Sequence, residues 1–166
     1  NATTILVPPF QGADGSVVVG AAGGRVEGAG GTFADVPPGA VPDGTVVRVE
    51  PLLAVAFGLP APAGYPFVGG IRVDLGGVTA RFPLDIGVAL PAGVTPQNDI
   101  VVAQPIQTAR GLAWTIVDRA APNAGRYETA SPPFPGPLAG SYAFLDPETN
   151  CVSWVGIVWH PQVNLI

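Results

Sequence analysis

The chain has no lysine, no methionine, one cysteine and one histidine, and only 11% of its residues are charged. All seven cations are therefore arginines, and against twelve carboxylates they leave a net charge of −5. A basic surface for nucleic acid is missing, which excludes that class of partner. One histidine and one cysteine are too few for a typical zinc site, and no aspartate-rich calcium loop is present. We therefore expect neither a metal nor another cofactor.

Long apolar runs and catalytic motifs are also missing. No apolar run approaches the ~20 residues of a membrane helix, so we expect no transmembrane segment. The single cysteine, Cys151, excludes a disulfide within the chain, and it is either buried and inert or paired with another chain. His160 lies next to Pro161 and no nucleophile motif accompanies it, so we expect no catalytic residues and no enzyme.

Glycine and proline, by contrast, are abundant, with 23 and 20 copies among 166 residues. The longest segment without either is residues 112–121, which is short for a helix and generous for a strand. A hydrophobic content of 48% argues against a disordered chain. The mean hydropathy of +0.41 suggests that apolar surface is covered by something outside the chain.

Alternation of apolar and polar side chains predicts strands. It is clearest over residues 45–50 and from Ile71 to Leu75, where every second side chain is apolar. The corner before the first of these strands holds Pro37-Pro38-Gly39 and Pro42-Asp43-Gly44, which favour tight turns. Strand follows strand without room for helical crossovers, which predicts an all-β, antiparallel β-sandwich with short strands and Pro/Gly-rich turns. The further strands that we expect cover residues 16–19, 25–27, 46–55, 67–75, 79–82, 84–90, 100–103, 112–117, 126–129 and 141–145.

Residues 33–45, preceded by Gly23-Gly24, resemble the opening of ZU5 domains, the β-sandwich modules of ankyrins, netrin receptors and many bacterial surface proteins. Residues 82–91, 111–114 and 140–144 are similar to later strands of that family. The resemblance implies a β-sandwich over residues 23–145, with an N-terminal strand and linker at 1–22 and a C-terminal hydrophobic strand at 146–166. Some relatives cleave themselves at a His-Phe-Ser sequence. Because neither histidine nor phenylalanine directly precedes Ser141 here, we do not expect self-cleavage.

The C-terminal segment over residues 151–159 is uncharged and apolar on both faces of a strand. An exposed edge strand is normally guarded by charge, so this segment should be buried on both sides. It is either the last core strand or a strand donated to a neighbouring copy. The N-terminal segment with Ile5 is the other candidate for exchange. The predicted subunit interface therefore comprises eight side chains: Ile5, Val7, Val152, Trp154, Val155, Ile157, Val158 and Trp159.

Two functions follow as hypotheses. The first is a structural subunit of an extracellular or cell-surface assembly, such as a filament or surface layer, in which copies of the chain polymerise by strand addition. The alternative is a ligand- or glycan-binding β-sandwich module of a larger surface protein. In that case the terminal strand belongs to the core.

Overall fold

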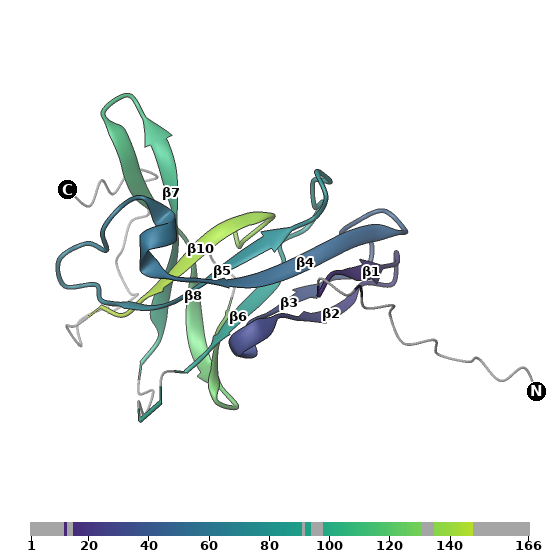
Figure 1. The fold of residues 1–166 in the computed structure, drawn as a ribbon, viewed down its shortest axis with the longest axis horizontal. Coiled ribbons are helices and arrows are strands. Elements are labelled where there is room, and N and C mark those ends of the chain that lie inside the picture. The colour runs from purple at the N-terminus through teal and green to yellow at the C-terminus, as the bar shows by residue number, and fades with distance from the viewer. Residues whose placement is uncertain (1–11, 13–14, 91, 94–97, 131–134, 148–166) are drawn as a thin grey trace, which may run out of the picture.

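The computed structural model describes residues 12, 15–90, 92–93, 98–130 and 135–147. These residues form an all-β fold, which confirms the predicted class (Figure 1). Ten antiparallel strands make one sheet in the order β1-β4-β5-β10-β7-β8-β9-β6-β3-β2. The strands are β1 Val17–Val19, β2 Gly24–Glu27, β3 Phe33–Val36, β4 Thr45–Leu52, β5 Phe67–Asp74, β6 Asp85–Ala89, β7 Ile100–Thr108, β8 Gly111–Asn123, β9 Arg126–Thr129 and β10 Gly140–Leu145. Two 3₁₀ turns, η1 Ala29–Gly31 and η2 Ala54–Phe57, complete the described structure.

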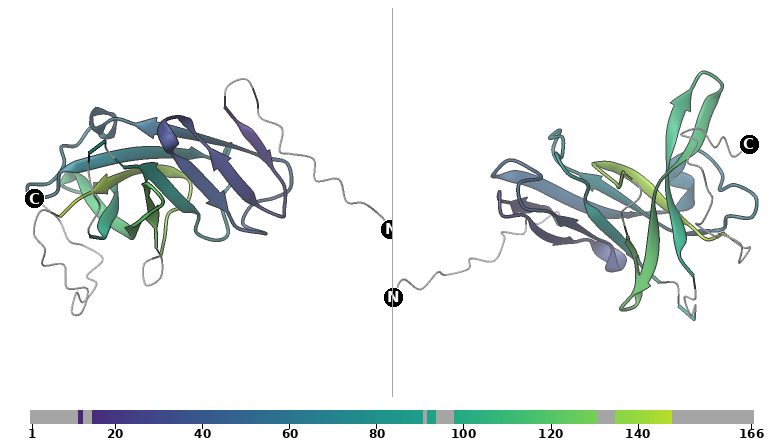
Figure 2. Two further views of the ribbon diagram at one scale, coloured as in Figure 1. Left: turned by 90° about the horizontal axis from the view of Figure 1, so that it is seen from below. Right: turned by 180° about the vertical axis from the view of Figure 1, so that it is seen from behind.

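The sheet folds back on itself into two layers (Figure 2). Strands β1, β4, β5, β10 and β7 form the first layer, and β9, β6, β3 and β2 form the second layer. The long strand β8 belongs to both layers, because its residues 111–120 pair with β7 while residues 120–123 pair with β9. The edge strands β1 and β2 are consecutive in the chain, so a short turn links the two layers where the sheet does not close.

The main core lies between the layers and explains why alternating residues form these strands. In β4 the side chains of Thr45, Val47 and Val49 are buried, whereas Val46 and Arg48 are exposed. Each large apolar side chain removed from water stabilises the fold by roughly 1.5–3 kcal/mol. The largest fully buried members of this core are Val26, Val47, Ile71, Val73, Leu75, Leu84, Ile86, Ile100, Val102 and Phe144.

The structure corrects the sequence prediction at several strands. The segment of residues 79–82 is not a strand, because it runs as a connection in which the Arg81 amide donates a hydrogen bond to the Ala40 carbonyl at 2.8 Å. Strand β1, by contrast, confirms the strand expected over residues 16–19 and pairs with β4. Strand β4 ends at Leu52, and β1 covers only its residues 45–47. Pro51 therefore sits where one side of β4 is not paired by another described strand, as a proline within a strand requires.

Candidate functional site

The outer face of the first layer carries a second apolar cluster, covered by residues 53–66 that connect β4 to β5. Strand β10 lies between the two cores: Tyr142 and Phe144 face the main core, and Ala143 and Leu145 face outward. We call the outward set the outer cluster. Its buried members are Phe57, Val101, Ala103, Trp114, Ala143 and Leu145.

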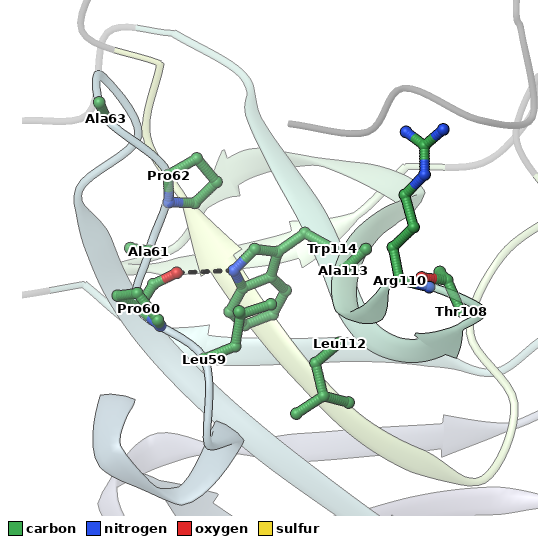
Figure 3. A pocket seen from close by; sticks show the side chains of 10 residues that line it. All are labelled: Leu59, Pro60, Ala61, Pro62, Ala63, Thr108, Arg110, Leu112, Ala113 and Trp114. Atoms are coloured by element: carbon green, nitrogen blue, oxygen red, sulfur yellow. Dashed lines mark hydrogen bonds between the residues drawn. The ribbon is translucent and has the colours of Figure 1, made fainter. Parts of the chain in front are cut away.

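Two aromatic side chains hold the covering connection onto the strands. The Phe57 ring, at the end of η2, lies 5.4 Å from the Trp114 ring and 6.0 Å from the Phe67 ring, both tilted. The indole Nε1–H of Trp114 donates a hydrogen bond to the Pro60 carbonyl at 2.8 Å (Figure 3). Trp114 is only 5% exposed, so its polar atom needs this partner, and the bond fixes the loop against β8.

Beside this anchor lies a pocket of about 550 Å³ between the covering loop and the start of β8 (Figure 3). Its walls are apolar except at one end, where Thr108 and Arg110 lie. The volume falls within the range of small-molecule and side-chain binding pockets, roughly 300–1,000 Å³. The lining residues are Leu59, Pro60, Ala61, Pro62, Ala63, Thr108, Arg110, Leu112, Ala113 and Trp114.

The polar end of the pocket is a tight turn between β7 and β8. The Thr108 hydroxyl donates to the Gly111 carbonyl at 2.7 Å and accepts from the Arg110 amide at 3.1 Å. Arg110 is exposed, and no acidic side chain of the described residues lies within ion-pair distance of it. The pocket therefore offers apolar walls and one unpaired cation, a combination suited to an apolar or aromatic group.

The same strands project from the body as a two-stranded ribbon, visible at the upper left of Figure 1. We call residues 104–115 the β7–β8 ribbon; its strands pair with each other but with no other strand of the described residues. Its only charge is Arg110. Two apolar side chains are exposed, Ile106 at 37% and Leu112 at 46%.

The outer face of the second layer is built differently. Two guanidinium groups lie against the Phe33 ring there, Arg25 at 4.0 Å and Arg126 at 5.1 Å from its centroid. Arg25 also forms a bidentate pair with Asp35, at 2.6 and 2.8 Å, which raises the pKa of the arginine. Arg126 pairs with Glu27 across strands at 3.2 Å.

Asp85 borders this charged face, opposite Asp35 in the pairing of β3 with β6. Partial burial raises the pKa of the Asp85 carboxyl, and the negative charges of Asp35 and Glu128 raise it further. These acidic groups do not form a metal cluster: among the described residues no three histidine, cysteine or acidic side chains converge on one point.

All eight predicted interface residues lie outside the described residues: Ile5, Val7, Val152, Trp154, Val155, Ile157, Val158 and Trp159. Cys151 and His160 lie outside them as well. Ser141 is described, and its hydroxyl accepts a hydrogen bond from Arg72 Nε at 3.2 Å on the surface of β10.

The pocket and the ribbon are sites that the sequence interpretation missed. Trp114 and Tyr142 are buried, as their positions in predicted strands indicated. However, the strand expected over residues 112–117 is more than twice as long in the structure, where β8 has 13 residues. The sequence did contain an indication of this length, since residues 112–121 form the longest stretch without glycine or proline.

Comparison with known proteins adds no family to this description. No protein-family model matches the chain, and no curated protein matches it either. In the described part of the chain, none of the helical segments has the length and apolar character needed to cross a membrane.

Proposed function

We propose that the protein is a structural subunit of an extracellular or cell-surface assembly, in which copies join by strand addition at the β7–β8 ribbon. The observation that carries the proposal is the edge of β8 over residues 111–116, which among the strands that the structure describes pairs with β7 alone. A free edge offers a row of backbone donors and acceptors to an incoming strand.

The ribbon lacks the usual protection against such pairing. Edge strands are commonly guarded by lysine, by inward-pointing charge or by proline. Strand β7 carries Pro105, whose nitrogen cannot donate, but residues 111–116 of β8 contain neither proline nor a charged side chain. An isolated two-stranded ribbon is also marginally stable in water, so a third strand would stabilise it. Both arguments favour β8 as the acceptor edge.

The test places a charge on this edge. Leu112→Lys replaces a 46% exposed apolar side chain, and Val46→Lys is the matched control, 48% exposed on β4. Loss of an apolar side chain from an interface costs roughly 1.5–3 kcal/mol, so Leu112→Lys should weaken assembly by about tenfold or more. Light scattering over a concentration series and electron microscopy would measure the assembly. A wild-type chain that stays monomeric throughout, or a Leu112→Lys chain that assembles as the wild type does, would refute the proposal.

The 550 Å³ pocket favours a second candidate, a ligand-binding module that holds a glycan or other small molecule. However, sugars bind by stacking on exposed aromatic rings, and Trp114 is only 5% exposed. Affinity of a monomeric chain for members of a glycan panel, abolished by Arg110→Ala, would establish this candidate instead.

A further inference from the structure

We infer that the pocket beside β8 receives a tryptophan side chain from residues 152–159 of a second copy, as that segment pairs along the free edge of β8. The inference rests on the proposed function and adds the identity of the donated strand and of its anchor. Three observations support it: the position of the pocket, the chemistry of its walls and the pattern of the segment.

The pocket lies where a strand added to β8 would place a side chain. Three of its lining residues, Leu112, Ala113 and Trp114, are consecutive in β8, whereas β7 contributes only Thr108. Alternate side chains of an added strand point to the same face of the sheet. One such side chain would meet the pocket, because three consecutive residues of β8 line it beside the edge that the strand would cover.

The walls suit a large aromatic side chain. Pro60 and Pro62 face β8 across the cavity, and the surroundings are otherwise mostly apolar (Figure 3). A buried aromatic side chain removes about 150–250 Å² from water, more than an aliphatic one. The Arg110 guanidinium lacks an acidic partner among the described residues, and a guanidinium is attracted to the face of an indole ring.

The segment matches this chemistry. Residues 152–159 have no charge, so their burial desolvates no ion, and they include two of the three tryptophans of the chain. Trp154 and Trp159 are an odd number of residues apart, so they lie on opposite faces of a strand. Only one of them can enter the pocket in a single register.

The chain leaves the described domain near the covering loop, since the Asp146 amide donates to the Pro66 carbonyl at 3.0 Å. Val152 follows Pro147 by five residues, which span at most about 18 Å when extended. This reach is long enough for the segment to meet a second copy, whose projecting ribbon offers an edge that no other described strand covers. Repetition of the exchange from copy to copy links the subunits head to tail.

Cysteine cross-linking in the full chain tests the contact. The native thiol is removed by Cys151→Ser, and Ala63→Cys places a new thiol on the exposed rim of the pocket. A second thiol is placed on the segment in two alternative variants. It is either Ser153→Cys, beside Trp154, or His160→Cys, beside Trp159. Controls carry Ala22→Cys, an exposed position in the β1–β2 turn, in place of Ala63→Cys. Mixing ¹⁴N- and ¹⁵N-labelled copies before oxidation lets mass spectrometry separate cross-links between copies from those within one copy.

We expect one of the two rim combinations to cross-link between copies at least about tenfold more than its control, because pairing raises the effective concentration of the thiols. Cross-links only within one copy, or no excess with either combination, would overturn the inference. Light scattering on the same samples distinguishes a failure of the pocket contact from a failure of the proposed function. Assembled chains without the cross-link refute the pocket contact alone, whereas monomers without it also refute the proposed function.

Discussion

The two outer faces of the sandwich have opposite chemistry. The face of the second layer covers the Phe33 ring with two guanidinium groups that are themselves paired to carboxylates. The face of the first layer covers its aromatic side chains with a proline-containing loop and leaves a pocket of about 550 Å³ at the end of the cover.

The difference indicates which outer face of the sandwich is protected against association with another chain. Cross-strand ion pairs contribute little stability at a solvated surface, yet they keep a face soluble and discourage pairing with other strands. The face of the first layer has no such ion pairs among the described residues of the β7–β8 ribbon. A partner is therefore expected on the face of the first layer and not on the face of the second.

The strongest test of this contrast removes the anchor of the apolar cover. Phe57→Ala should lower the free energy of unfolding by about 3–5 kcal/mol, because Phe57 is 6% exposed and contacts both Phe67 and Trp114. Chemical denaturation measures the loss. Val55→Ala, in the same 3₁₀ turn but 86% exposed, should change stability by no more than about 0.5 kcal/mol. Equal effects of the two substitutions would show that the loop is not packed as a cover.

On the charged face, Gly87→Ala tests how tightly Phe33 is packed. A β-carbon at Gly87 would lie 2.1 Å from Phe33 Cε1 and 2.9 Å from the Tyr127 carbonyl oxygen. Overpacking of this kind costs about 1–3 kcal/mol, again measured by denaturation. Since Phe33→Ala removes the nearest clash, the double variant should be more stable than the sum of the single effects implies. If the changes in unfolding free energy of the two single variants simply added up in the double variant, the close packing of Phe33 against Gly87 would be contradicted.

The smallest expected effect concerns Asp85. A carboxyl whose pKa is raised by folding binds its proton more tightly in the folded state, so stability falls as the pH rises from about 3.9 through the folded pKa. Asp85→Asn should therefore stabilise the protein at pH 7, by only a few tenths of a kcal/mol because solvent still reaches this partly buried carboxyl and screens its charge. The gain should vanish below about pH 3.9. Thermal unfolding at pH 3 and pH 7 checks the sign, and a gain confined to pH 3 would contradict it.

The sequence predicted the two-layered core best at strands such as β4 and β5, where alternation reveals one buried face. The outer cluster was harder to foresee. Phe57 comes from a connection rich in proline and glycine, where no period applies. The other buried members come from β7, β8 and β10, and β10 is buried on both faces over residues 142–145, so it shows no alternation. The prediction of residues 100–103 and 112–117 as strands was too short because most ribbon residues are intermediate or exposed, so no buried face marks the full length of β7 and β8.

Strand β8 runs for 13 residues from the tip of the ribbon into the second layer. Antiparallel hydrogen bonds lie perpendicular to the strands they join. A pull along β8 would therefore load its bonds to β7 and β9 side by side, in shear, instead of opening them one after another. In a chain of linked subunits, mechanical tension received at the ribbon would thus spread through both layers of each subunit.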